Sequence, residues 1–280
     1  PADVAGVKVR SEANEGLALL ALNAIPVNLG TSDLGSALQT GIVEGCFFTY
    51  SGIGGFSGVG PNTQYTTELN LYYRSYSLAM NREVYEGLPA EARQALDSIT
   101  GADASMYWAA QHKAGEADAK DETISGPMFP PPAHPEWGRV PYEPTAAPWI
   151  EELKGLTGSQ GGTFDVVETY GDAPFDATAS LSAISTGTVD MGQLSGDTYH
   201  LGGIGFLPFL FPDMETAAYA TYHLFTEDDG KWDAAGELTD VKILITTPLW
   251  GMQWWGNVDV RVPADVAGVK VRSEANEGLA

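Results

Sequence analysis

Residues 1–18 read PADVAGVKVRSEANEGLA, a stretch that joins an expected strand, Val7–Arg10, to an expected helix, Asn14–Ala24. In the helix, apolar residues recur at intervals of three and four, the spacing of one buried helix face. Strands and helices go on alternating along the chain, and this alternation predicts an α/β fold. The next expected elements are an extended piece at Pro26–Asn28, a helix from Thr31 or Ser32 to about Glu44, and a strand at Cys46–Tyr50.

Further along, the same patterns predict strands at Leu69–Met80, Thr163–Tyr170, Val189–Leu194 and Val241–Thr247, and helices at Pro89–Ile99, Ala102–Ala114, Ala177–Ser185 and Thr216–Phe225. Two segments interrupt the alternation. The run GIGGFSGVG at 52–60 predicts a flexible loop rather than a dinucleotide site, because its spacing is not G-x-G-x-x-G. Met128–Pro148 is rich in proline, which predicts irregular structure.

The overall charge excludes several classes of partner. With 37 acidic and 14 basic residues the formal charge is -23, so binding to nucleic acid is not expected. An anionic ligand would need a local positive group to offset this field. One cysteine, Cys46, allows no disulfide within the chain, and the four histidines show no metal-binding spacing. No metal or cofactor is expected, and no apolar run of about 18 residues suggests a membrane span.

The two ends of the chain carry the same sequence. Residues 263–280 repeat residues 1–18 without a difference, and nothing between them resembles the repeat. A solenoid would show several approximate copies. The simplest hypothesis is a ring: the chain reads like a circularly permuted sequence that continues past its own starting point.

Several motifs together resemble the solute receptors of tripartite ATP-independent periplasmic (TRAP) transporters, the DctP-like family. The run P-x-D-x-x-G-x-K-x-R at 1–10 matches a family signature in which the arginine clamps a ligand carboxylate. Further resemblances are SALQTGIVEG at 36–45, NREVYEGLP at 81–89, TVDMG at 188–192 and FLPFLF at 206–211. Their order is rotated relative to the family, which supports the ring hypothesis independently of the repeated ends.

The resemblance implies a two-lobed, periplasmic-binding-protein-like α/β fold with a hinged cleft, in circularly permuted order. One lobe would comprise residues 1–70 with 251–262, and the other residues 71–250. Residues 263–280 are expected to form a displaced tail. If they docked instead, the break in the chain would interrupt the helix that continues through residues 19–24, and a break in a loop costs less.

The function that the resemblance implies is that of a periplasmic receptor. It would bind a small organic acid without transforming it and deliver it to membrane permease subunits, although this chain, which begins at Pro1, shows no signal peptide. Arg10 is the expected clamp, because a guanidinium holds a carboxylate through two parallel hydrogen bonds. Arg272 is its counterpart in the second copy.

The remaining expected ligand contacts come from three regions. Trp250, Gln253 and Trp254 are expected near the hinge, where the tryptophans would form an aromatic wall for the ligand. Packing in the core of a lobe is an equally good interpretation of the tryptophans. Phe48 and Tyr50 make the site apolar, which favours a monocarboxylate with an apolar or aromatic body. Tyr73, Gln193 and Ser195 match family contact positions, and His134 lies on a loop where packing is an equally good interpretation.

Two alternatives stay open at this point. A hydrolase-like enzyme would need a nucleophile, a base and an orienting acid, and the chain has no G-x-S-x-G elbow and no histidine near Cys46 in sequence. No catalytic residue is therefore expected. A rearranged or truncated product without function is the second alternative, because the duplicated end and the shortened last helices of the family pattern favour it.

Overall fold

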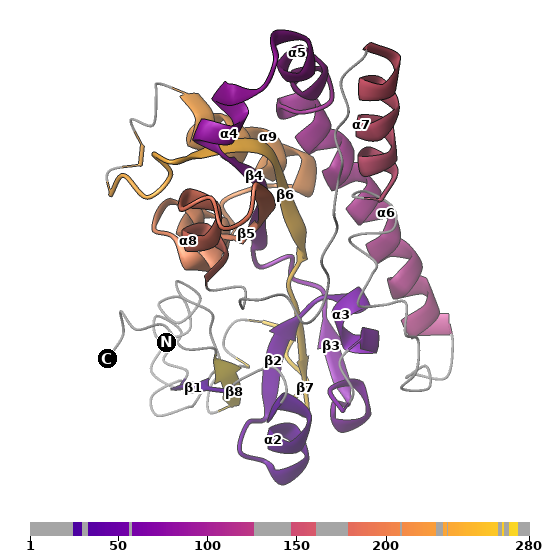
Figure 1. The fold of residues 1–280 in the computed structure, drawn as a ribbon. Helices are drawn as coiled ribbons and strands as arrows, with labels where there is room; N and C mark the ends of the chain where they lie inside the picture. The colour runs from indigo at the N-terminus through magenta and orange to yellow at the C-terminus, as the bar shows by residue number, and fades with distance from the viewer. Residues whose placement is uncertain are drawn as a thin grey trace.

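The computed structural model describes residues 25–29, 33–55, 58–125, 147–160, 179–207, 209–227, 232–233, 235–262, 265 and 269–273. They form a mixed α/β structure with one sheet of five strands and one of three. Figure 1 shows the three-stranded sheet in the upper half of the molecule and the five-stranded sheet in the lower half. The expected α/β class is confirmed.

The five-stranded sheet combines strands from the two ends of the chain. Its order is β1-β8-β2-β7-β3. β8 runs parallel to β1 and β2, whereas β7 runs antiparallel to β2 and β3. The strands are β1 (Ile25–Asn28), β2 (Gly45–Phe48), β3 (Tyr65–Thr67), β7 (Gln253–Gly256) and β8 (Lys270–Ser273).

The second copy of the repeated sequence supplies β8. Val271 lies opposite Pro26 on one side and opposite Gly45 on the other, so the strand has a neighbour at each edge. The expectation that residues 263–280 form a displaced tail is therefore wrong for β8. Residues 1–18, the first copy, lie outside the described residues.

The link from β7 to β8 gives the physical reason for this correction. Val260 and Val269 are buried in the same cluster as Trp254 of β7. The carboxylate of Asp265 accepts hydrogen bonds from the backbone N–H groups of Arg261 and Val262, at 2.8 and 2.9 Å, which closes a turn. The link thus ties the second copy to the core, and residues 257–262 precede only that copy.

The three-stranded sheet is antiparallel, in the order β5-β4-β6. Its strands are β4 (Tyr73–Asn81), β5 (Met191–Ser195) and β6 (Val241–Gly251). Along β4, residues 73–78 alternate between buried and half-buried, so the strand presents two faces of different exposure. Its register places Tyr76 opposite Ser195, and Tyr73 opposite Gly251.

Most of the helices surround the three-stranded sheet (Figure 1). Two begin with side-chain caps: Asn81 accepts the N–H of Val84, and Asp213 that of Thr216. The helices are α2 (Leu34–Thr40), α3 (Tyr50–Gly55), α4 (Arg82–Gly87), α5 (Ala90–Ser98), α6 (Ala102–Ser125), α7 (Ala147–Gln160), α8 (Ser180–Ser185) and α9 (Met214–Thr226), with 3-10 turns η3 (Gly60–Asn62), η7 (Gly196–Thr198) and η8 (Leu201–Phe206).

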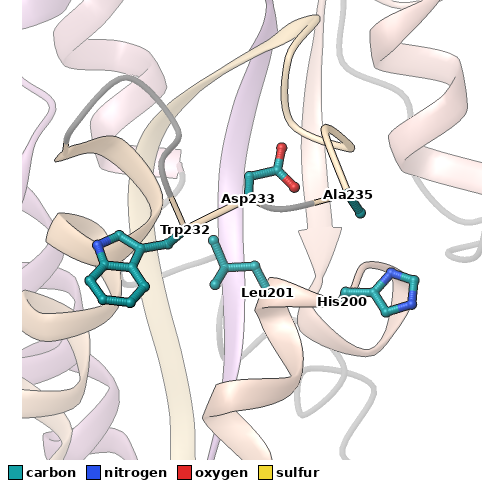
Figure 2. A pocket seen from close by; sticks show the side chains of 5 residues that line it. All are labelled: His200, Leu201, Trp232, Asp233 and Ala235. Carbon is teal, nitrogen blue, oxygen red and sulfur yellow. The ribbon is translucent and has the colours of Figure 1, made fainter.

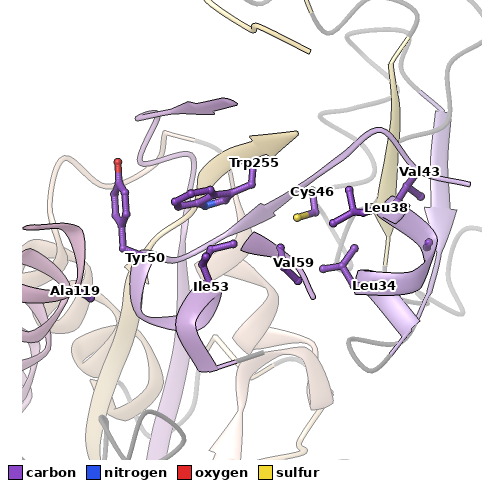
Figure 3. Packing of buried hydrophobic residues seen from close by; sticks show 10 residues of the cluster. Leu34, Leu38, Val43, Cys46, Tyr50, Ile53, Val59, Ala119 and Trp255 are labelled. Carbon is purple, nitrogen blue, oxygen red and sulfur yellow. The ribbon is translucent and has the colours of Figure 1, made fainter. Parts of the chain in front are cut away.

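The long helix α6 contacts the elements of both sheets. It packs on α9 and β6 in the upper half and reaches α3 in the lower half. Figure 3 shows its Ala119 at the edge of the core of the five-stranded sheet. The other labelled residues of that core are Leu34, Leu38, Val43, Cys46, Tyr50, Ile53, Val59 and Trp255. Helix α6 therefore joins the two halves independently of the chain crossings between the sheets.

The sequence predictions for β1, β2, β4, β5, β6, α2, α5, α6, α8 and α9 are confirmed, with ends shifted by a few residues or more. Helix α2 stops at Thr40, before the expected Glu44, because Gly41 takes a left-handed φ of 72°. The flexible loop expected at 52–60 is wrong, since Tyr50–Gly55 form α3 and Gly60–Asn62 form η3. The strand expected at Thr163–Tyr170 and most of the proline-rich segment lie outside the described residues.

Candidate ligand-binding site

An aromatic cluster lies where the two sheets meet. Phe47 of β2 and Trp254 of β7 pack edge to face, with ring centroids 5.6 Å apart. Tyr72, just before β4, lies 5.5 Å from Phe206 of η8. All four rings belong to one buried cluster. The junction is therefore a shared apolar core, and any ligand between the sheets would lie beside it.

Trp254 is part of this core. Its side chain is 0% exposed, and its indole N–H donates to the carbonyl oxygen of Val258 at 3.2 Å. A Cβ atom added at Gly45 would lie 2.2 Å from the Trp254 ring, so only glycine lets β2 lie this close. Trp254 thus packs as a core residue, and its expected contact with a ligand stays a prediction. Trp250 lies in β6, but its side chain is outside what the structure describes.

Gln253 binds the chain segments that connect the sheets. Its Oε1 accepts the backbone N–H groups of Leu69 and Asn70, at 2.7 and 3.1 Å. Its Nε2 donates to Asn70 Oδ1 and to the carbonyl oxygen of Gly251, both at 2.8 Å. The amide is 2% exposed. Gln253 therefore fixes the crossing between the sheets, and its expected ligand contact stays a prediction.

Phe48 and Tyr50 follow one another along β2 and α3 but have different surroundings. Phe48 lies opposite Gln253 in the sheet, is half-buried and packs over Gly52. Tyr50 is 3% exposed, with its ring centroid 5.3 Å from that of Trp255. The ammonium group of Lys120 lies 5.7 Å from the centre of the Tyr50 ring. Tyr50 is thus a core residue that α6 covers, whereas Phe48 keeps some exposure at the junction.

A buried carboxylate attaches α6 to α3. Glu116 accepts the backbone N–H groups of Tyr50 and Ser51, at 2.5 and 3.0 Å. Nearby, Lys120 forms an ion pair of 2.6 Å with Glu68. Burial raises the pKa of Glu116 above its ordinary value, and the two backbone hydrogen bonds oppose that shift without cancelling it.

Replacing Glu116 with Gln should make the stability less dependent on pH. The unfolded chain ionises Glu116 near its ordinary pKa, while the folded protein keeps the proton to higher pH, so rising pH across this window lowers stability. Gln does not titrate, but its amide nitrogen cannot accept the backbone N–H that one carboxylate oxygen accepts, so Glu116→Gln should be less stable than the wild type at low pH. In urea unfolding this deficit should shrink as the pH rises from about 4 to about 8, because only the wild type loses stability across this window. A deficit that stays constant or grows with pH would contradict the raised pKa.

Three expected ligand residues on the three-stranded sheet, Tyr73, Gln193 and Ser195, differ in their exposure and in their contacts. Tyr73 packs with Met214 of α9, and burial raises the pKa of its phenol. Gln193 is exposed. Ser195 is 5% exposed, and its hydroxyl accepts a hydrogen bond of 3.3 Å from Nη2 of Arg74. Of these three residues, Ser195 is the one with a cationic neighbour.

Arg74 is a candidate that the sequence analysis did not single out. It is half-buried on β4, with its guanidinium carbon 5.3 Å from the ring centre of Tyr76 and 5.6 Å from that of Phe206. A sequence signal does exist: Arg74 is the one charged residue in the run LYYRSYSLAM at 71–80. In a chain of charge -23, a cation inside an otherwise neutral strand suggests a specific role.

Two expected ligand residues, Arg10 and His134, lie outside the described residues. For Arg272, which lies in β8, the structure describes the backbone. It pairs with that of Val27 in β1. Residues Lys270–Ser273 of the second copy, which include Arg272, thus form a strand of the five-stranded sheet.

A surface cavity of about 420 Å³ lies elsewhere, on the three-stranded half. Figure 2 shows the residues that line it: His200, Leu201, Trp232, Asp233 and Ala235. The carboxylate of Asp233 accepts the backbone N–H groups of Glu237 and Leu238. None of the expected ligand residues lines this cavity, so it is separate from the junction of the sheets.

Within the described part of the chain, no three His, Cys, Asp or Glu side chains gather into a possible metal site. The helices described there are all too short or too polar to cross a membrane.

Comparison with known proteins gives a family match for the first part of the chain. Residues 1–132 match the DctP family, bacterial extracellular solute-binding protein family 7. The DctP segment includes the first copy of the repeated sequence and runs through β1–β4 and α2–α6. It is a family of solute-binding proteins rather than enzymes, in agreement with the expectation of binding without catalysis.

One curated relative extends the DctP comparison. The C4-dicarboxylate-binding periplasmic protein DctP of Rhodobacter capsulatus is 32% identical over 100 residues. The match covers 35% of this chain and 29% of that protein, so the chain spans less than a third of its relative's length. No solved structure matches the chain.

Proposed function

We propose that this chain is the extracytoplasmic, periplasmic solute receptor of a TRAP-type transporter. It binds a small organic acid in the region between its two sheets and delivers it to membrane permease subunits. The DctP-family match over residues 1–132 carries this proposal. The relative from Rhodobacter capsulatus, a C4-dicarboxylate-binding periplasmic protein, supports a carboxylate as the ligand.

The two sheets would be the cores of two lobes. One lobe would comprise residues 1–70 with residues from 251 onward, and the other residues 71–250. The chain crosses between the sheets at residues 68–72 and 251–253, where Gln253 makes its hydrogen bonds. Two crossings at one place would allow one lobe to rotate about the other, as in hinged closure around a ligand. The ring hypothesis would explain why strands from both ends share a sheet.

The clamp arginine would come from the VKVR strand. The cost of a chain break inside a helix favours Arg10, whereas the pairing of β8 with β1 and β2 favours Arg272. One strand fills the slot between β1 and β2, so one copy provides the clamp. We propose Arg272 for this role, because its backbone already belongs to the sheet.

A thermal-shift experiment tests the function and the clamp together. A panel of aliphatic, 2-oxo and aromatic carboxylates is screened against the wild type, Arg272→Ala and Arg10→Ala. A ligand at about 100 times its Kd stabilises the folded state by about 2.7 kcal/mol, which should raise Tm by about 5 °C. We expect one class of acid to shift the wild type and Arg10→Ala, but not Arg272→Ala.

The other outcomes separate the parts of the proposal. Loss of the shift in Arg10→Ala alone would assign the clamp to the first copy. A sharp melt that no acid shifts would overturn the proposed function, and a broad melt would favour a rearranged product without function.

A further inference from the structure

Two residues with an unusual backbone conformation lie where the chain crosses between the sheets. Among the described residues other than glycine, only Asn70 and Phe209 have a positive φ, at 47° and 56°. Asn70 lies in the first crossing, and the backbone N–H of Phe209 donates to the carbonyl oxygen of Leu71 at 2.7 Å. Asparagine tolerates this left-handed region, whereas phenylalanine adopts it at a cost in free energy. The strain at Phe209 is therefore attached directly to the crossing.

The two crossings are tightly connected to each other. The backbone of Met252 in the second crossing accepts the N–H of Leu71 at 3.0 Å and donates its own N–H to the carbonyl oxygen of Tyr72 at 3.2 Å. A Cβ atom at Gly251 would overlap Oδ1 of Asn70, so the crossings lie as close together as a glycine permits. A rotation of one sheet relative to the other must therefore change backbone angles at these residues or at their immediate neighbours.

The packing of its own side chain does not impose the conformation of Phe209, because the ring is 67% exposed. Phe206, three residues earlier, is fully buried, and its ring centroid lies 5.5 Å from that of Tyr72. The segment is thus anchored in the core at Phe206, while the hydrogen bond to Leu71 holds Phe209. Strained backbone of this kind persists only where the surroundings impose it, and it is concentrated at sites that bind or switch.

We propose that the strain at Phe209 tunes the hinge, because it raises the free energy of the described arrangement relative to one in which the lobes have rotated. This inference rests on the proposed function, since it requires that one lobe rotates about the other. When the hinge moves, the carbonyl oxygen of Leu71 moves with it, and Phe209 returns to a negative φ. The two arrangements are then close in free energy, so a ligand needs little binding energy to select one of them.

A pair of variants, Phe209→Gly and Phe209→Ala, tests this inference. Both remove the exposed ring, but only glycine adopts a positive φ without cost. The comparison is between two folded arrangements, so the greater freedom of glycine in the unfolded chain does not enter. Pulsed electron spin resonance measures the distance between the two halves, from spin labels on Gln39→Cys in α2 and Glu91→Cys in α5, both exposed positions. Cys46 is buried and stays in place, because a label does not reach it.

We expect two distances, one of which matches the described arrangement. Phe209→Gly should raise the population ratio in favour of this arrangement by about 5- to 30-fold relative to Phe209→Ala. Equal ratios in the two variants, with and without the panel of carboxylates, would overturn the role of Phe209 and leave the hinge of the proposed function intact. A single distance in every protein, which no carboxylate changes, would overturn the rotation as well.

A second pair of variants separates relief of strain from a general effect of glycine on the chain. Leu210 is also exposed, but its φ is not positive. Leu210→Gly and Leu210→Ala should therefore give the same population ratio. A shift as large as that of the Phe209 pair would contradict the proposal, because it would arise from chain flexibility rather than from the left-handed conformation.

Discussion

A protein without residues 263–280 should lose the five-stranded sheet as a stable unit. The deletion removes β8, leaving β1 without its described neighbour and opening the edge of β2. It also removes Val269, which is 3% exposed in the aromatic cluster. We expect a loss on the order of 5 kcal/mol, comparable to the whole stability of many domains. Urea unfolding, followed by tryptophan fluorescence and circular dichroism, measures it.

The repeated sequence supplies a matched control for this deletion. A protein without residues 1–18 loses the same sequence from the other end, so composition and charge change equally. It should keep β8 and most of its stability. Equal stability of the two proteins would show that either copy fills the slot between β1 and β2. The reverse order would show that the first copy is the one that matters.

Trp254→Ala should be the most damaging single substitution among those discussed above. The side chain is 0% exposed and packs against Phe47, and Gly45 and Gly256 both lie within contact distance of its ring. Truncating a fully buried tryptophan leaves a cavity that such glycines cannot fill, which costs about 3–5 kcal/mol. The free energy of unfolding in urea gives the value directly.

Trp232→Ala is the control for this substitution. Trp232 is 54% exposed beside the surface cavity, so its removal should cost less than about 1 kcal/mol. If both variants lose the same small amount of stability, Trp254 does not hold the junction together as the structure indicates.

Local pattern was enough to predict most of the elements but not their ends. The strongly apolar run at Val241–Thr247 marked β6, and helical spacing in residues 216–225 marked α9. The glycines at 52–55 predicted a loop, whereas Tyr50–Gly55 form α3. Glu116 receives the first N–H groups of that helix from a distant part of the chain. Such tertiary support overrides low helix propensity and has no local sequence signal.

The candidate site residues show the same difference between local pattern and tertiary contact. Family motifs marked Ser195, and the structure places it beside a cation. Gln253 and Trp254 were chosen for their residue type near an expected hinge, yet their partners are the backbone at 69–70 and the aromatic core. Residue type shows what a side chain is able to bind. Which partner it meets depends on segments that are far apart in sequence.

By itself the sequence determined the α/β class, the family resemblance and the repeated ends, because each depends on order and spacing along the chain. Only the tertiary structure decided that the second copy forms β8 and that Arg74 contacts Ser195. Two identical sequences have identical local preferences, so their neighbours must distinguish them. Here the link through Val260 and Asp265 ties one copy to the core of the five-stranded sheet. Burial and hydrogen bonding between distant segments make that choice, and no pattern within the repeated stretch records it.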